Sequence, residues 1–392
     1  MKLSIIIPAY NEEKSIAEVI ERVLRERSRV KESLPQIDYI ELIVVNDGST
    51  DNTGIIAAGY KEIVLINREK NYGYGAALKC GFENAGGEII SFLDVDQTYP
   101  PEELWRLCKE LMDKRLDLVV GSRISQGRGQ MSWIRFLGNK FFAYLLAWIT
   151  HKRITDAASG MWVFRKDILK NLYPLPDGMN FPLVITLKAI FEGLKFCEIP
   201  ITYRQRVGKS KLKVFRDGLI FLSSIIHVTE TYNPLKFFGM VGFILILIAM
   251  VYGIQPLFYY LSTKTISEGM IYRLLSIMVL INIGLIAISL GILSNYIISF
   301  IRNKKIKNTR LNNLLYNRLM PKIGLLGIFL VFLGLAINYK TIYQYVAFRQ
   351  IYVHWSYLVT GALFILSGIQ FYMLGTLGKI LRALNEIFNR QK

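Results

Sequence analysis

Short apolar runs alternate with helix-period segments along the first part of the chain. The runs are rich in Ile, Val and Leu, and between them a stretch such as residues 12–26 repeats apolar positions every three or four residues. Strands that alternate with helices indicate βαβ units, so we expect an α/β domain on a mostly parallel sheet. The five predicted strands are residues 3–7, 40–45, 62–66, 88–93 and 116–122.

Each predicted strand is followed by polar or glycine-rich sequence. In an open α/β sheet, ligands bind outside the carboxyl ends of the strands. We therefore expect these segments to form one composite site. They are PAYNEE (8–13), NDGSTDNT (46–53), NREKNYGYGAA (67–77), DVDQ (94–97) and GSR (121–123).

Two carboxylates, Asp94 and Asp96, stand one residue apart directly after the fourth predicted strand. Alternate residues of an extended segment face the same way, and like charges held together are unfavourable unless a positive group lies between them. Two acids with Gln97 beside them suit Mg²⁺ or Mn²⁺, which complete their coordination with substrate phosphates. The alternative is a solvated turn before the helix that Pro100 and the following residues predict.

The C-terminal part of the chain contains four apolar stretches. Spanning a bilayer takes about 20 apolar residues, and these stretches have no polar face that would suit a core helix. We expect four transmembrane helices, with the third continuing beyond its first charged residue. The predicted spans are residues 235–261, 274–301, 323–345 and 355–378, within a membrane domain of 235–392.

The positive charge is unevenly distributed. Residues 1–234 hold 32 Lys and Arg against 28 Asp and Glu, whereas residues 235–392 hold 16 against 2. This argues against a nucleic-acid partner and for basic loops at a membrane. The segment 302–322 carries seven Lys and Arg, whereas 262–273 and 340–354 carry two each. Because basic loops remain inside, we expect both termini and the α/β domain to be cytoplasmic.

Two further apolar segments with basic flanks, about 133–153 and 211–234, precede the membrane domain. Trp, Phe and Tyr between Lys and Arg suit the headgroup level, so we interpret both as interfacial helices lying on the bilayer. The alternative is that they are core helices. In either case the first helix belongs to the α/β domain, which we assign to residues 1–210, and the second links that domain to the membrane.

Several motifs resemble the family-two glycosyltransferases of GT-A fold, in order and spacing: IIIPAYNEE, VVNDGSTDNT, NYGYGAALKCGFENAGGEII, FLDVDQTYPPEEL and LVVGSR. DAASGMWVF (156–164) and EIPITYRQRVGKSKL (198–212) narrow the resemblance. With the membrane helices, they look like the polyprenyl-phosphate hexosyltransferases, which include dolichol-phosphate mannose synthases and undecaprenyl-phosphate glucosyltransferases. The resemblance covers about residues 1–230.

The resemblance implies an inverting transfer of a hexose from a GDP-mannose-type or UDP-glucose-type donor to a polyprenyl or dolichyl phosphate at the cytoplasmic membrane face. One departure is Gly73-Tyr74-Gly75, where the family has a lysine that contacts phosphate. The implied roles are as follows: Pro8, Tyr10 and Glu12 cradle the nucleoside, Val45 and Asp47 meet the base and ribose, Val95 lies against the donor, Asp94, Asp96 and Gln97 hold the metal, and Arg123, Arg206 and Lys211 contact phosphates.

Three other functions fit less well. The glycines of residues 73–81 resemble a dinucleotide fingerprint, but they do not follow the first strand. A processive polysaccharide synthase would carry QxxRW, which QMSWIR (130–135) does not spell. A non-catalytic lipid-carrier scaffold would not need the intact acid pair. The sequence is also compatible with a homo-oligomer.

Overall fold

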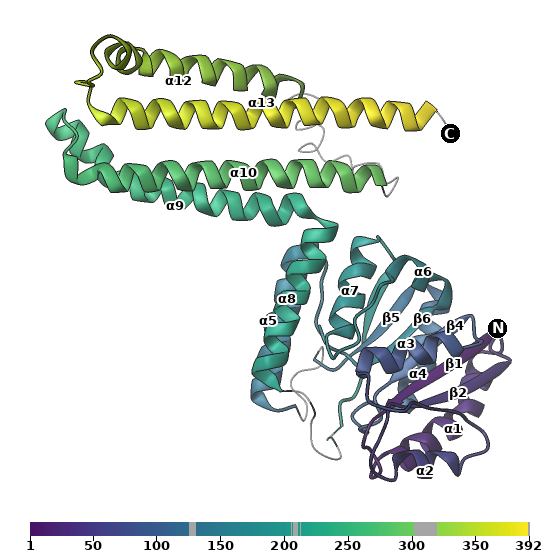
Figure 1. Ribbon diagram of the computed structural model, residues 1–392. Helices are drawn as coiled ribbons and strands as arrows, with labels where there is room; N and C mark the ends of the chain where they lie inside the picture. Colours follow the sequence, from purple (N-terminus) through teal and green to yellow (C-terminus); the bar gives the residue numbers. More distant parts are fainter. Residues whose placement is uncertain (125–130, 205, 207–210, 212, 302–319, 391–392) are drawn as a thin grey trace. The chain divides into compact units, whose positions relative to one another are not determined.

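The computed structural model describes residues 1–124, 131–204, 206, 211, 213–301 and 320–390. The chain forms two compact units, Met1–Val228 and Thr229–Lys392. Residues 302–319, which make up most of the predicted basic segment 302–322, lie outside the described residues, as does Lys209 of the motif EIPITYRQRVGKSKL. Figure 1 shows the elements of both units.

The first unit contains a seven-stranded sheet with the order β3-β2-β1-β4-β6-β5-β7. The strands β1, β2, β3 and β4 are mutually parallel, β6 is antiparallel to both of its neighbours, and β7 is parallel to β5. This confirms the mostly parallel α/β sheet. The strands are β1 (Lys2–Ala9), β2 (Tyr39–Asn46), β3 (Val64–Asn67), β4 (Ile89–Leu93), β5 (Leu118–Ser122), β6 (Met161–Arg165) and β7 (Phe196–Pro200).

Strand β6 is a difference from the prediction, which had no strand at these residues. It lies between β4 and β5, so the fourth and fifth predicted strands are not neighbours. Because β6 is antiparallel to both, β4 and β5 still point the same way. The segments that follow Leu93 and Ser122 therefore leave the sheet at the same edge.

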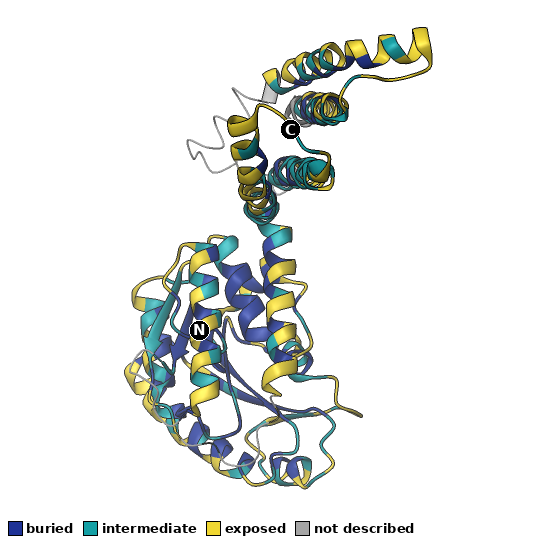
Figure 2. Cartoon of the chain, turned by 90° about the vertical axis from the view of Figure 1, so that its left-hand side faces the viewer, coloured by how far each residue is buried: buried dark blue, intermediate teal, exposed yellow. Residues whose placement is uncertain are grey.

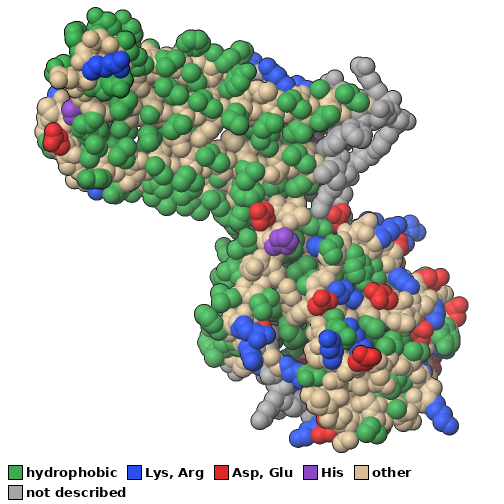
Figure 3. Space-filling view, viewed as in Figure 1, with side chains coloured by type: hydrophobic (Ala, Val, Ile, Leu, Met, Phe, Trp, Pro, Cys, Tyr) green, Lys and Arg blue, Asp and Glu red, His purple; other side chains and the backbone are tan. Residues whose placement is uncertain are grey.

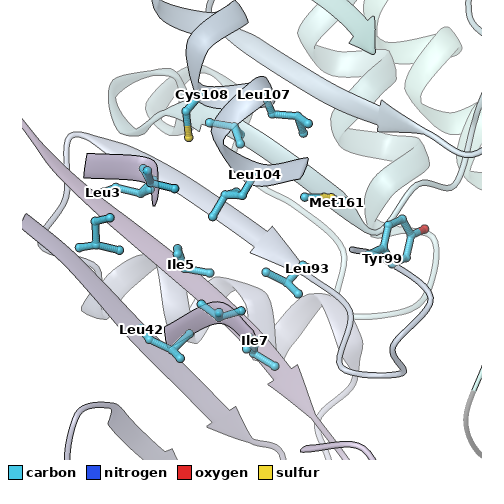
Figure 4. Packing of buried hydrophobic residues seen from close by; sticks show 14 of the residues in the cluster. Leu3, Ile5, Ile7, Leu42, Leu93, Tyr99, Leu104, Leu107, Cys108 and Met161 are labelled. Atoms are coloured by element: carbon cyan, nitrogen blue, oxygen red, sulfur yellow. The ribbon is translucent and has the colours of Figure 1, made fainter. Parts of the chain in front are cut away.

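Helices cover both faces of the sheet. One core joins β1 and β4 to α1 and α4 through residues such as Ile5, Leu93 and Leu107, which are fully buried (Figure 4). On the other face, rings of Phe82 and Phe181 pack around Phe92 of β4. The central strands are buried (Figure 2). The helices are α1 (Ile16–Ser33), α2 (Thr53–Ala58), α3 (Tyr74–Asn84), α4 (Leu104–Asp113), α5 (Trp133–Thr150), α6 (Leu169–Leu172), α7 (Phe181–Phe191) and α8 (Val214–Tyr232), with 3₁₀ turns at Pro101–Glu103 and Lys166–Ile168.

The second unit contains four helices that are long and apolar enough to cross a membrane, as the sequence predicted. On the face seen in Figure 3, hydrophobic side chains cover them, whereas charged side chains are scattered over the α/β unit. Helices α9 and α10 approach closely at Gly242, where a Cβ would lie 2.4 Å from the carbonyl oxygen of Gly284. The helices are α9 (Pro234–Thr263), α10 (Ile271–Ile301), α12 (Met320–Phe348) and α13 (Trp355–Arg390), with a 3₁₀ turn at Glu268–Met270.

Candidate active site

A first cavity of about 480 Å³ opens at the carboxyl edge of the sheet. Nearly all of the predicted nucleotide-sugar residues line it, although they come from strand ends far apart in the chain. Val45 is the exception, because it is fully buried within β2 and does not line this cavity. The predicted residues in its wall are Pro8, Tyr10, Glu12, Asp47, Asp94, Val95, Asp96, Arg206 and Lys211.

The two acids lie together at this cavity, as their spacing predicts. Oδ1 of Asp94 accepts a hydrogen bond from the hydroxyl of Tyr74 at 2.7 Å, and Oδ1 of Asp96 accepts the backbone N–H of Thr98 at 3.1 Å. A Cβ at Gly160 would lie 2.1 Å from Oδ2 of Asp94, so only glycine fits beside this carboxylate. The acid pair is held on several sides by fixed neighbours.

Two basic side chains partly neutralise the carboxylates at this edge. Arg206 lies with Nη1 3.0 Å from Oδ2 of Asp96 and Nη2 3.4 Å from Oε1 of Glu12. Lys211 lies with Nζ 2.8 Å from the same Glu12 oxygen and 5.1 Å from the centre of the Tyr10 ring. Of the predicted phosphate-binding cations, Arg206 thus reaches the acid pair, and Lys211 reaches Glu12 beside it.

The donor set of the acid pair fits a divalent cation. Mg²⁺ usually binds through one or two carboxylates and keeps its remaining positions for water and substrate phosphates. Among the described residues, no group of three or more His, Cys, Asp and Glu converges on one point. Asp94 and Asp96 would therefore hold a cation together with a phosphorylated ligand, and they do not form an all-protein metal cage.

Gln97, the third predicted metal ligand, does not line either cavity of this site. Its backbone has a positive φ of 64°, and its amide nitrogen donates to Oε2 of Glu18 on α1 at 2.7 Å. The left-handed backbone turns the side chain away from the acid pair. The structure therefore brings Asp94 and Asp96 together without Gln97.

Burial, and then repulsion from Asp96, raise the pKa of Asp94 to about 7. A metal ligand must be deprotonated, so a proton competes with the cation below that pH. We expect the affinity for Mn²⁺ to rise about tenfold between pH 6 and pH 8. Electron paramagnetic resonance of free Mn²⁺ would measure this. Asp94→Asn should remove most of the dependence, and a flat wild-type profile would contradict the prediction.

A second cavity of about 160 Å³ lies beyond the acid pair. Three guanidinium groups line it, from Arg123, Arg135 and Arg206, together with Asp94 and Asp96. Its other walls are largely apolar and include side chains of α5 and α8, whose Phe142 and Phe221 rings are 5.5 Å apart. The cavity therefore combines cations with an apolar lining.

Arg123 is fixed in place by Asp156. Its Nε and Nη2 donate to the two carboxylate oxygens of Asp156, each at 2.8 Å, and Nη2 also donates to the carbonyl of Ala158. Asn139 of α5 donates to the same carboxylate at 2.7 Å. The bidentate pair leaves little freedom to the guanidinium, so Arg123 faces the second cavity in one orientation.

The sequence analysis gave no role to several polar residues of this site, among them Tyr74, Arg135, Asn139 and Asp156. Tyr74 was noted only for the lysine it replaces, yet it binds Asp94. The glycines beside it serve packing, because a Cβ at Gly75 would lie 2.1 Å from the carbonyl oxygen of Pro176. Asp156 opens the motif DAASGMWVF, which narrowed the resemblance, whereas no local pattern marks Asn139 as its partner.

Helices α5 and α8 expose apolar side chains on their outer faces. Their inner faces bury Asn139 and Leu146 of α5 and Phe221 and Ile225 of α8. The exposed residues recur every three or four positions, which forms one stripe on each helix. They are Ile134, Leu137, Phe141, Tyr144 and Trp148 on α5, and Phe215, Leu219, Leu222 and Ile226 on α8.

Comparison with known proteins finds two family models that match parts of the chain. Residues 4–173 match the model of glycosyl transferase family 2, and residues 234–392 match a domain of unknown function, DUF8752. The low-salt glycan biosynthesis hexosyltransferase Agl6 of Haloferax volcanii is 34% identical over 220 residues, which cover 55% of this chain and 51% of that protein. The chain thus spans about half the length of this relative.

Two further proteins are similar. The undecaprenyl-phosphate 4-deoxy-4-formamido-L-arabinose transferase of Sodalis glossinidius is 28% identical over 305 residues, which cover 76% of this chain and 88% of that protein. A solved structure of glucosyl-3-phosphoglycerate synthase from Mycobacterium tuberculosis has a TM-score of 0.48 and 20% identity, covering 58% of this chain and 79% of that chain. The chain carries a domain that matches the glycosyl transferase family 2 model over residues 4–173, and four helices that are long and apolar enough to cross a membrane follow it.

Proposed function

We propose that the protein transfers a hexose from a nucleotide-diphosphate sugar to the phosphate of a polyprenyl or dolichyl lipid, with inversion at the anomeric carbon. One observation carries the proposal. Two cavities meet at Asp94 and Asp96: one is lined by the predicted nucleotide-sugar residues, and the other by arginines and apolar helices. A donor and a phosphorylated lipid would thus meet at the acid pair.

The first cavity suits the donor. Its volume lies within the range of about 300–1,000 Å³ that is typical of small-molecule sites. Pro8, Tyr10 and Asp47 would surround the nucleoside, and Arg206 and Lys211 would contact the diphosphate. Asp94 and Asp96 would hold Mg²⁺ or Mn²⁺, and such a cation would neutralise charge on the departing nucleoside diphosphate.

The second cavity suits the head of the acceptor. Arg123 and Arg135 would bind a phosphate there, while the apolar side chains of α5 and α8 would contact the first isoprene units. The exposed stripes of these two helices support the prediction that they lie on the bilayer surface, where the lipid tail remains. The acceptor could then react without leaving the membrane.

The acceptor chemistry requires no strong general base. A lipid monophosphate carries roughly −1.5 to −2 charge near neutral pH, so its oxygen is already a nucleophile. The obstacle is to bring two anions together. Arg123, Arg135, Arg206 and Lys211 would provide the positive charges that position both phosphates and stabilise the developing charge.

A transfer assay tests the proposal against its alternatives. Membranes that contain the protein are incubated with radiolabelled nucleotide sugars and a short polyprenyl phosphate, and the organic phase is extracted. Label in the lipid phase is the expected result. Label in a polymer would indicate a processive polysaccharide synthase, and no label with any donor would indicate a non-catalytic scaffold. The same donor panel identifies the sugar.

We also propose that the α/β unit and both termini are cytoplasmic, on the basis of the basic segment 302–322. A membrane-impermeant thiol reagent applied to intact cells should modify Thr265→Cys and Gln350→Cys but spare Asn308→Cys. Permeabilised cells provide the control, in which all three positions should react. Modification of Asn308→Cys from outside would reverse the orientation.

A further inference from the structure

The two cavities share a junction, where some residues line both. Tyr74, Asp94, Asp96 and Arg206 belong to this shared wall, and the contacts described above occupy them with one another. The junction also includes Asp217, a residue to which the sequence analysis gave no role. Two apolar residues, Met179 and Phe221, complete the shared wall.

The geometry of the proposed reaction fixes what must occupy this junction. The hexose is bonded to the diphosphate, which the first cavity would hold, and it is attacked by the acceptor phosphate, which the second cavity would hold. The sugar ring must therefore lie between them. Side chains that line both cavities are those that contact the hexose.

Asp217 has the chemistry of a hydroxyl-binding group. Only 6% of the residue is exposed, and its Oδ2 accepts the backbone N–H of Lys213 at 2.7 Å. Among the described residues, Oδ1 accepts no hydrogen bond, and its ion pair with Nε of Arg216 is long, at 3.8 Å, and involves a side chain that is 71% exposed. A largely buried residue whose second carboxylate oxygen accepts no hydrogen bond from the described residues favours a ligand that brings a donor.

The negative charge of Asp217 favours contact with the neutral sugar over contact with the phosphate groups of the two substrates. A carboxylate repels both the donor diphosphate and the acceptor phosphate, whereas the hydroxyl groups of a neutral hexose donate hydrogen bonds to it. A metal role for Asp217 is not supported, because no cluster of three acids exists among the described residues. Met179 and Phe221 would pack against the apolar C–H face of the ring.

We infer that Asp217 binds a hydroxyl group of the transferred hexose and thereby contributes to the choice of donor sugar. The inference rests on the proposed function, because the position of the hexose follows from the two substrates. It places a specificity residue on α8, a helix that also exposes an apolar stripe. Donor recognition and the acceptor cavity would then share one helix.

Asp217 also has a structural role, which an experiment must distinguish from binding of the hexose. Asp217 is the fourth residue after Lys213, in the first turn of α8, and it caps the start of this helix by accepting the backbone N–H of Lys213. Asp217→Asn keeps an acceptor for this N–H, whereas Asp217→Ala removes it. Loss of the cap alone would weaken all ligands of the cavity to a similar extent.

The test compares binding of nucleotide sugars with binding of the bare nucleotides. Calorimetry on the purified full-length protein with Mn²⁺ would use UDP, GDP and a panel of UDP-hexoses and GDP-hexoses. We expect Asp217→Ala to weaken the preferred nucleotide hexose at least tenfold and its nucleoside diphosphate less than twofold, with Asp217→Asn intermediate. Glu230→Gln, a matched charge change on the same helix outside both cavities, should alter neither.

Deoxy donors give a second readout. One of the deoxy donors, which lacks the hydroxyl group that Asp217 binds, should bind the wild type at least tenfold more weakly than the complete donor does. The same deoxy donor should bind Asp217→Ala less than twofold more weakly than the complete donor does. Equal losses for nucleotide and nucleotide sugar would overturn the inference, as would a panel in which no hexose binds more tightly than its own nucleotide. If Asp217→Ala selectively loses hexose binding but the wild type transfers no sugar to lipid, only the proposed lipid acceptor would be refuted.

Discussion

Asp96→Asn is expected to lower sugar transfer by about a hundredfold or more while the protein remains folded. Asn is isosteric and can still accept the N–H of Thr98, which holds the Asp96 side chain at 3.1 Å. It cannot supply the negative charge that a divalent cation requires beside Asp94. The reaction would then lose the group that neutralises the leaving diphosphate.

The measurement combines transfer with metal binding. A chelator should abolish transfer in the wild type, and Mg²⁺ or Mn²⁺ should restore it, whereas neither ion should restore Asp96→Asn. Titration of Mn²⁺ should show weakened binding in the variant, with thermal unfolding close to that of the wild type. Full activity in the presence of chelator would refute the assignment of Asp94 and Asp96 as metal ligands.

Gln97→Asn is the matched control for this prediction. Gln97 has a positive φ, which Asn tolerates better than most residues, and its amide contacts Glu18 instead of the acid pair. Transfer and Mn²⁺ affinity should therefore change less than twofold. A large loss of metal affinity would restore the predicted ligand role of Gln97.

Lys211→Ala is expected to lower transfer at least tenfold without releasing the protein from the membrane. Its ammonium group lines the first cavity beside Glu12, where a contact with the donor diphosphate is charge-assisted and partly shielded from water. Such contacts are worth about 1.5–3 kcal/mol. The loss should appear mainly as weaker donor binding.

Lys213→Ala is the matched control two residues away. Its side chain is exposed and lines neither cavity, so it can contribute only attraction to anionic lipids, about 1 kcal/mol at low salt. Activity should be close to that of the wild type. Equal, mild losses at both positions that diminish with added salt would mean that this basic stretch only anchors the protein.

Local sequence patterns were sufficient for the elements and for much of the site. The alternation of apolar runs and helical periods predicted β1 to β5 and most of the helices between them, because burial of one face imposes a period on each element. The length of the apolar stretches predicted the four long helices. The spacing of Asp94 and Asp96 predicted their convergence, since both follow one strand.

Contacts between distant segments depended on the order of the strands, which no local pattern encodes. The antiparallel β6 lies between β4 and β5, and the residues just before it place Asp156 against Arg123. The predicted cations Arg206 and Lys211 reach Glu12 only because the folded chain returns to the end of β1.

The sequence by itself therefore determined which residue types gather at the strand ends, because strand direction places those ends at one edge. Only the tertiary structure decided their partners. It turned Gln97 toward Glu18 through a left-handed backbone, placed Tyr74 on Asp94, and brought Asp217 of α8 to the junction of the two cavities. These positions result from the packing of helices against the sheet, to which residues far apart in the chain contribute together.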